Sequence, residues 1–322
     1  MSRLPLSRRA FLRAAGILSA GGVLAACRGL DLGSGTLHLA LISDVHMLPN
    51  DVAVEGLQRA LDHLHQQRPA VQAILNAGDS ILDALQTPEA EVAAAWEAFT
   101  QTMQAGTDLP VHSVIGNHDV WGWGLATPGL EDDPHYGKAW AVEALGLPAP
   151  YYAFGLGEWQ FYALDSTHRP TLEAGDPYGD MPYTGRLDDP QFEWLEQQLA
   201  QSDPERPVAI LSHIPILSAG ELLDGDNEAS GNWLVPGAWI HIDARRLVEL
   251  FHQHPNVRLC LSGHSHQYER LEYLGVTYVS GGAICGKWWM GDYMHFPPGY
   301  VLLDLAPDGT CQSRFVDYNA QG

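Results

Sequence analysis

The sequence predicts one α/β domain with a central sheet of buried strands. Three observations carry this prediction. Apolar runs of four to six residues alternate with segments of helical periodicity, and five of the runs end in a cluster of Gly, Asp, Asn, Ser or His. No repeat, low-complexity tract or obvious linker divides residues 37–317. Alternation of this kind is typical of α/β domains whose central strands are covered on both faces.

The expected elements follow in chain order. A strand is expected at 37–42, and a helix at 51–68 carries Leu57, Leu61 and Leu64 on one face before Pro69 ends it. Three further helices are expected, after Pro88, after an Asp189 N-cap with Pro190 as first helical residue, and after an Asp243 cap. Further strands are expected at 71–75, 111–115, 151–154, 159–164, 208–211 and 257–261. Residues 120–150 are predicted to be irregular, and short strands with Gly-rich turns to fill the remainder.

Residues 1–26 predict an export signal that precedes the fold. They contain four Arg and no acid, and the apolar run at 14–26 is too short to cross a bilayer, which takes about 20 residues. Residues 7–12 resemble a twin-arginine signal, and residues 24–27 resemble a bacterial lipobox. These resemblances imply lipidation of Cys27 and a membrane-anchored protein on the periplasmic or extracellular side. A linker is expected at 27–36, which contains a short Gly/Ser stretch, and the domain at 37–322. Two alternatives remain: an ordinary disordered N-terminus, and an ordinary cleavage site beside a spare Cys27 thiol.

The charge balance argues against a nucleic-acid partner. The chain carries 17 Lys and Arg against 39 Asp and Glu, which gives a net charge of −22. Because phosphate backbones are bound by clustered Lys and Arg, no nucleic acid is expected. Without residues 1–26 the balance becomes 13 − 39 = −26, which strengthens the argument.

Metal-ligating residue types gather where the expected strands end. The clusters are Ser43–His46, Asn76–Asp79, Gly116–Asp119, Ser212–Pro215 and Ser262–His266. Ligands of open α/β sheets bind beyond the carboxyl ends of the strands, so the clusters can converge in one crevice. They supply carboxylate and amide oxygens and imidazole nitrogens without a thiolate, a set that suits Zn, Mn or Fe. Five such clusters in order predict a site for two metal ions.

Together, these motifs resemble those of the calcineurin-like metallophosphoesterases over residues 37 to about 305. The motifs are Asp44-x-His46, Gly78-Asp79, Gly116-Asn117-His118-Asp119, His213 and Gly263-His264-x-His266. The form of the third motif is most similar to the bacterial cyclic-nucleotide and glycerophosphodiesterase branch. The resemblance implies a four-layer αββα sandwich of two mixed sheets flanked by helices.

The resemblance also implies a role for each motif residue. One ion would be held by Asp44, His46 and His266, and the other by Asn117, His213 and His264. Asp79 would bridge the two ions, and His118 would lie near the leaving group.

Two departures from related patterns matter. Purple acid phosphatases of this superfamily carry a Tyr three residues after the bridging Asp, and this chain has Leu82 there. A tyrosinate-bound ferric ion is therefore not expected. The protein-phosphatase branch places at the same position an Asp that orients the catalytic His. In this chain the nearest candidates are Asp83 and Asp119, and the sequence leaves the choice between them open.

The expected activity is metal-dependent hydrolysis of a phosphoric ester, with a small phosphodiester favoured. A hydroxide bridging two Mn, Fe or Zn ions would attack phosphorus in line, and a protonated His118 would donate to the departing oxygen. Two alternatives remain: a phosphomonoesterase at the same site, and a metal-holding lipoprotein that binds a ligand without turnover. No oligomeric state is predicted.

Some residues outside the motifs have two interpretations. Trp121, Trp123 and Trp288 are candidates for contact with a substrate, although packing of loops onto the domain is the preferred interpretation. Lys287 and Arg169 could contact a phosphate or be ordinary surface charges. Cys285 and Cys311 could form a disulfide outside the cytoplasm, which the sequence alone does not decide.

Overall fold

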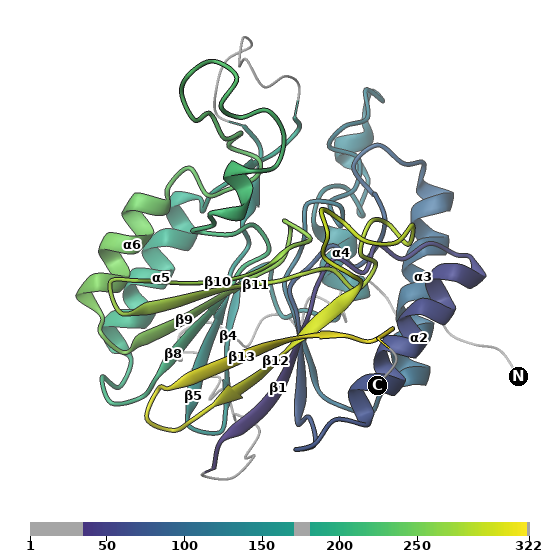
Figure 1. Ribbon diagram of the computed structural model, residues 1–322. Coiled ribbons are helices and arrows are strands. Elements are labelled where there is room, and N and C mark those ends of the chain that lie inside the picture. The colour runs from purple at the N-terminus through teal and green to yellow at the C-terminus, as the bar shows by residue number, and fades with distance from the viewer. Residues whose placement is uncertain (1–34, 171–180, 321–322) are drawn as a thin grey trace, which may run out of the picture.

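Two β-sheets packed face to face, with helices on their outer sides, form the protein (Figure 1). This arrangement confirms the four layers that the family resemblance predicted. The computed structural model describes residues 35–170 and 181–320. The export signal and Cys27 lie outside the described residues, and the division at residues 26 and 36 stays a prediction. No helix in the described ranges is long and apolar enough to cross a membrane.

The first sheet has five strands in the order β13-β12-β1-β2-β3. Its central strands β1, β2 and β3 are parallel, while β12 is antiparallel to β1 and β13 is antiparallel to β12. The strand bounds are Leu37–Ile42 for β1, Ala73–Asn76 for β2, Val111–Ser113 for β3, Gly299–Leu305 for β12 and Cys311–Asp317 for β13.

The second sheet has six strands in the order β10-β11-β9-β8-β5-β4. Strands β5, β8, β9 and β11 are parallel, and an antiparallel strand closes each edge. The bounds are Tyr152–Leu156 for β4, Trp159–Ala163 for β5, Val208–Leu211 for β8, Val257–Ser262 for β9, Tyr268–Tyr273 for β10 and Val276–Gly281 for β11. A separate two-stranded ribbon pairs β6 (Thr167–His168) with β7 (Thr184–Gly185).

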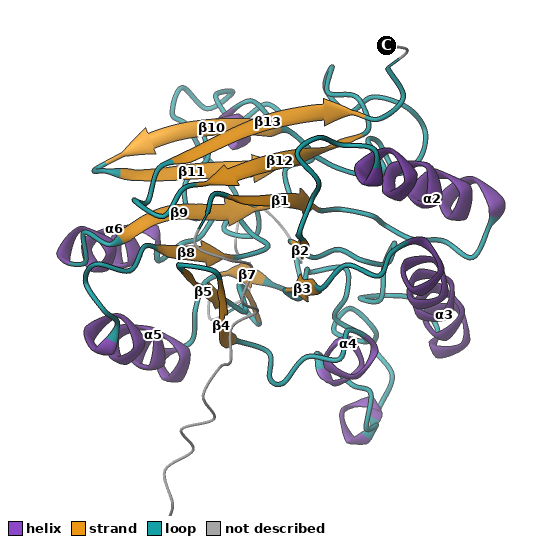
Figure 2. Ribbon diagram, turned by 90° about the horizontal axis from the view of Figure 1, so that it is seen from below, coloured by secondary structure: helices purple, strands orange, loops and turns teal. Residues whose placement is uncertain are grey.

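Helices cover the outer face of each sheet (Figure 2). Helices α2 and α3 lie beside the first sheet, and α5 and α6 beside the second. The helix bounds are Asp51–His65 for α2, Glu89–Gly106 for α3, Ala139–Ala144 for α4, Asp189–Gln201 for α5 and Ala244–Gln253 for α6. Two single turns of 3₁₀ helix span Leu130–Asp132 and Gly220–Leu222.

Three local expectations need correction. The side chain that caps α5 is Asp188, which accepts a hydrogen bond from the Gln191 backbone N–H, so the predicted cap at Asp189 was one residue late. Asp243 precedes α6 but makes no capping bond there, because its carboxylate accepts from Leu187 N instead. The short helix α4 lies inside the segment that was predicted to be irregular.

The central strands are buried on both faces, which explains their continuous apolar sequence. In β1, Leu39 and Leu41 face the second sheet, while Ala40 and Ile42 face the helices. The inner layer holds large side chains from both sheets, among them the fully buried Phe161. The two sheets are thereby fixed against each other, and the turns at their carboxyl ends can form one rigid site.

A substitution at Phe161 tests whether the layer between the two sheets is the core of the protein. The Phe161 ring is fully buried and stacks on Phe154 at 4.9 Å between centroids. We expect Phe161→Ala to lower the free energy of unfolding by about 3–5 kcal/mol, because it leaves a cavity between the sheets. Urea denaturation measures the change, with Tyr273→Ala as control, since Tyr273 is 50% exposed on edge strand β10. Equal losses in the two variants would contradict this assignment of the core.

Candidate metal centre

The structure brings all seven predicted metal ligands together at the carboxyl ends of five strands. Strand β1 leads into the turn with Asp44 and His46, β2 into that with Asp79, and β3 into that with Asn117. From the second sheet, β8 leads to His213, and β9 leads to His264 and His266. Hydrogen-bond and ion-pair contacts join ligands of the two sheets, as between His213 and Asp79 at 3.2 Å. All seven side chains except His264 are buried.

Five of the seven predicted ligands have a left-handed backbone, which residues other than glycine rarely adopt. The φ angles are 52° for Asp44, 45° for His46, 52° for Asp79, 72° for His264 and 56° for His266. Each such residue carries strain of roughly 1 kcal/mol or more, which the surrounding structure must offset. Backbone bonds between turns do this: Asp44 N donates to Gly78 O and His46 N to Asp79 O, each at 3.0 Å. Strained backbone gathered in one place is typical of functional sites.

Glycine lets these turns approach one another closely. A Cβ atom on Gly116 would overlap the backbone N and the carboxylate of Asp79. A Cβ on Gly263 would overlap the side chains of Ser43 and Asp44. Because only glycine fits at both positions, the carboxylates of Asp79 and Asp44 can lie against the neighbouring turns.

The first group of donors is centred on two imidazoles. Atoms His46 Nε2 and His266 Nε2 are 3.0 Å apart, and Asp44 Oδ1 lies 3.9 Å from the first and 3.5 Å from the second. Backbone carbonyls fix both tautomers, since His46 Nδ1 donates to Leu82 O at 3.2 Å and His266 Nδ1 to Gly286 O at 2.7 Å. The two Nε2 atoms therefore face each other, and their hydrogen bond needs one added proton, whose place a metal ion would take.

The second group has the same character. His213 Nδ1 donates to Ala77 O at 2.7 Å, which directs Nε2 toward the centre as the ring atom that would bind a metal. That nitrogen lies 2.9 Å from Asn117 Oδ1, 3.2 Å from His264 Nδ1 and 3.2 Å from Asp79 Oδ2. Nitrogen and oxygen atoms of residues that follow four strands thus face one point, an arrangement that suits a bound cation.

Asp79 lies between the two groups. Its Oδ2 atom is 3.2 Å from His213 Nε2 in the second group and 3.7 Å from His46 Nε2 in the first. The other oxygen, Oδ1, accepts a hydrogen bond from the His118 backbone N–H at 2.8 Å. One oxygen of this carboxylate therefore fixes a turn while the other faces both groups, as a bridging ligand would.

Electrostatics in the centre favour positive charge. Burial disfavours the charged imidazole of His213, but the Asp79 carboxylate outweighs it and raises the pKa of His213 to about 9. Burial opposes ionisation of Asp79, yet the neighbouring imidazoles hold the pKa of its carboxyl well below the usual range. The donor set of two carboxylates, one amide and four imidazoles fits two divalent ions of the Mn, Fe or Zn type.

The structure decides which carboxylate faces His118. Asp83 Oδ1 lies 3.5 Å from His118 Nδ1, whereas Asp119 is occupied elsewhere. Burial disfavours the protonated ring of His118, but Asp79 and Asp83 outweigh it and raise the pKa of His118. The ring packs edge-on against His46 at 4.9 Å, so it borders the first donor group. Of the two carboxylates left open by the sequence, Asp83 is the one placed to orient His118.

Asp119 joins two of the predicted ligand turns. Its Oδ1 accepts from Ser80 N at 2.8 Å and Ile81 N at 3.2 Å, and its Oδ2 accepts from Gly116 N at 2.9 Å. Burial and the nearby Asp79 raise the pKa of Asp119 to about 7. One fully buried side chain therefore holds the turn after β2 against the turn after β3.

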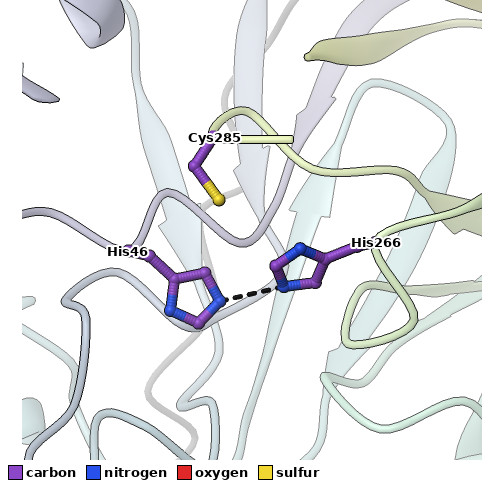
Figure 3. Close-up of side chains that lie close together, drawn as sticks. All are labelled: His46, His266 and Cys285. Atoms are coloured by element: carbon purple, nitrogen blue, oxygen red, sulfur yellow. Dashed lines mark hydrogen bonds between the residues drawn. The ribbon is translucent and has the colours of Figure 1, made fainter. Parts of the chain in front are cut away.

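One sulfur atom belongs to the centre and was not anticipated. Cys285, His46 and His266 each place a possible ligand atom within 4.8 Å of the others (Figure 3). The disulfide with Cys311 that the sequence left open is not formed, since Cys285, Cys311 and Cys260 are all free thiols. Burial raises the pKa of the Cys285 thiol, and the Asp44 carboxylate adds to the effect. Cys285 lies 19 residues beyond His266 and matches no ligand spacing, so no signal in the sequence pointed to it.

The aromatic candidates separate into two kinds. Trp121 is 2% exposed and packs edge-on against Trp140, so it belongs to the core instead of a substrate surface. Trp123 packs under Arg169, whose guanidinium lies 4.9 Å from the ring centroid. Trp288 alone of the three borders the centre, with its ring 5.1 Å from that of His266.

Comparison with known proteins agrees with this geometry. The sequence model of the calcineurin-like phosphoesterase family matches residues 37–268. The chain belongs to this family. It is therefore a phosphoester hydrolase, from a family whose members use two metal ions.

Relatives and solved structures extend the comparison. The chain is 24% identical over 294 residues to a 3',5'-cyclic-nucleotide phosphodiesterase of Nostoc, covering 86% of this chain and 91% of that protein. It is 22% identical to the 3',5'-cyclic adenosine monophosphate phosphodiesterase CpdA of Escherichia coli K12, covering 86% and 88%. The crystal structure of a dimetal phosphatase from Danio rerio shares the fold, with a TM-score of 0.58, 15% identity and coverage of 88% and 100%.

Asp119 provides a test of how the centre is held. We expect Asp119→Ala to lower the free energy of unfolding by about 2–4 kcal/mol, because three backbone N–H groups lose their acceptor. Metal content after dialysis against Mn²⁺ should fall as well, since the two turns are no longer joined. Urea denaturation and elemental analysis measure the two effects. The control is Asp62→Ala, on the exposed face of α2, where a change within about 0.5 kcal/mol is expected. Unchanged metal content in Asp119→Ala would show that the bonds of Asp119 to the two turns are not needed to hold the metal ligands in place.

Proposed function

We propose that the protein hydrolyses a small phosphodiester with two divalent ions held by the seven predicted ligands. The observation that carries this proposal is the pair of donor groups on either side of Asp79, with His118 at their border. Such a pair can clamp both the attacking and the leaving oxygen of an in-line displacement. When bound, the ions would activate water and offset negative charge on the phosphate.

The side chains of the protein have distinct tasks in this proposal. Backbone carbonyls orient the imidazoles of His46, His213 and His266 with Nε2 toward the centre before any ion arrives, and Asp79 lies between them. Asp83 faces His118 Nδ1, so Nε2 is the nitrogen that would donate a proton to the departing oxygen. An alkyl or nucleoside oxygen leaves poorly without such a donor, whereas p-nitrophenolate needs little help.

Relatives support a diester substrate. The Nostoc and Escherichia coli proteins are named as 3',5'-cyclic-nucleotide and cyclic adenosine monophosphate phosphodiesterases, which makes cyclic nucleotides the first substrates to test. Trp288 and Tyr293, whose rings lie 5.1 and 5.3 Å from His266, offer aromatic surface for the organic part of such an ester. A protein anchored at Cys27 outside the membrane, as the sequence predicts, would meet extracellular nucleotides and glycerophosphodiesters.

Two alternatives have different expectations. A phosphomonoesterase would use the same ligands and prefer a terminal phosphate. A metal-holding binding protein would need neither His118 nor the pairing of that residue with Asp83. Since the protein retains both, with all seven predicted ligands, catalysis is favoured.

A substrate panel tests the function. We expect the protein loaded with Mn²⁺ or Zn²⁺ to hydrolyse bis-p-nitrophenyl phosphate and 3',5'-cyclic AMP faster than 5'-AMP. EDTA should abolish all turnover, and added Mn²⁺ should restore it, because the donor groups alone supply no nucleophile. Faster release of phosphate from 5'-AMP would favour the monoesterase. Absence of turnover on every ester by a protein that binds two ions would favour the binding protein.

His118→Ala separates proton donation from metal binding. We expect this variant to keep its metal content and to lose about 100- to 10,000-fold in turnover of a dialkyl phosphodiester. The loss should be much smaller for bis-p-nitrophenyl phosphate, whose leaving group needs no proton. His252→Ala, on the exposed face of α6, serves as the control and should match the wild type on both esters. Equal losses on the two esters would contradict a proton-donor role.

A further inference from the structure

We propose that the thiol of Cys285 is an additional ligand of the ion held by His46 and His266, and that it biases this position toward thiophilic metals. The proposal rests on the metal centre of the proposed function and adds a donor that no motif of the sequence contains. It also changes the expected chemistry of the centre, which the sequence predicted to be free of sulfur.

The geometry places the sulfur within reach of a shared ion. Cys285 is fully buried, and its Sγ and the two imidazole nitrogens lie within 4.8 Å of one another. Figure 3 shows the sulfur on the side of Cys285 that is turned toward both rings. A sulfur and a nitrogen bound to one zinc ion, at about 2.3 and 2.0 Å, lie roughly 3.5 Å apart in tetrahedral geometry. A small movement of the sulfur toward the rings, with a slight widening of the 3.0 Å between the two nitrogens, would place all three atoms around one ion.

Backbone contacts hold the Cys285 turn against the ligands themselves. Cys285 N donates to Asp44 O at 3.3 Å, and the next residue, Gly286, accepts from His266 Nδ1 at 2.7 Å. On the other side, Trp289 N donates to Cys285 O at 2.9 Å, and the Trp289 indole donates to His46 O at 3.1 Å. The turn is thus bonded to three predicted ligands of the same ion, so the sulfur moves with them.

The sulfur makes its hydrogen bonds with backbone atoms. The thiol donates a long bond of 3.5 Å to Gly286 O, and the backbone N–H groups of Trp288 and Trp289 are directed at the sulfur. Cys260 and Cys311 belong to no group of possible metal ligands among the described residues, which distinguishes Cys285 from both. On coordination, the thiol proton would pass to solvent and the thiolate would bind the ion. Because thiolates prefer Zn and Fe to Mn, the position would select these metals.

Cobalt spectroscopy tests this ligand directly. The full protein is stripped of metal and titrated with Co²⁺, with Cys285→Ala and the matched control Cys260→Ala treated in parallel. Sulfur bound to Co²⁺ gives a charge-transfer absorption in the near ultraviolet, separate from the visible bands that report all bound cobalt. We expect this absorption in the wild type and in Cys260→Ala, and its loss in Cys285→Ala while cobalt still binds. Competition between Zn²⁺ and Mn²⁺ should show that Cys285→Ala loses at least about tenfold of the preference for zinc.

Each outcome has a definite meaning. A wild-type protein that binds two cobalt ions without the charge-transfer absorption overturns sulfur ligation and leaves the proposed function standing. Persistence of the absorption in Cys285→Ala overturns it as well. A wild-type protein that binds no ion contradicts the metal-dependent function itself. If Cys285→Ala does not fold, X-ray absorption of the zinc-loaded wild type decides, because bound sulfur gives a shell at about 2.3 Å and its absence overturns the proposal.

Discussion

Convergence of lone pairs at the carboxyl ends of two sheets is the interaction on which the rest of this structure depends. Atoms His46 Nε2 and His266 Nε2 face each other at 3.0 Å, and the carbonyls that accept from their Nδ1 atoms hold both rings in this orientation. Such an arrangement is favourable only with a proton or a metal ion between the two nitrogens. The inner core that fixes the two sheets holds these nitrogens in place, and this rigidity prepares the centre for metal.

Strain in the turns is a second consequence. Five predicted ligands have left-handed backbone, and none of the five is glycine. The free-energy cost of this strained backbone is offset by hydrogen bonds between the turns. The Asp119 carboxylate contributes three of them, because it accepts from three backbone N–H groups. The glycines at 116 and 263 complete the arrangement, because they let the turns touch where any Cβ would clash. The motif residues thus act partly on the metal and partly on one another.

Much of the fold could be predicted, because buried parallel strands have a distinctive sequence. The runs at 37–42, 208–211 and 257–261 match β1, β8 and β9 within a residue, since a strand covered on both faces must be apolar throughout. The short helix α4 was missed, because one and a half turns in a segment rich in Gly and Trp give no helical period. The cap of α5 was misplaced by one residue because Asp188 and Asp189 are both capping types, and only the backbone geometry distinguishes them.

By itself, the sequence determined the family and predicted the metal donors in their order along the chain: carboxylates, amide and imidazoles at the ends of five strands. It did so because these residues must follow the strands directly, so their spacing is local. The tertiary structure decided what depends on contacts between distant segments. It placed Asp83 beside His118, assigned Asp119 to joining two turns, buried Trp121 in the core, and brought Cys285 to the predicted ligands. None of these residues lies at a fixed sequence separation from its partner. Packing of the sheets brings each pair together, and this packing depends on many segments of the chain at once.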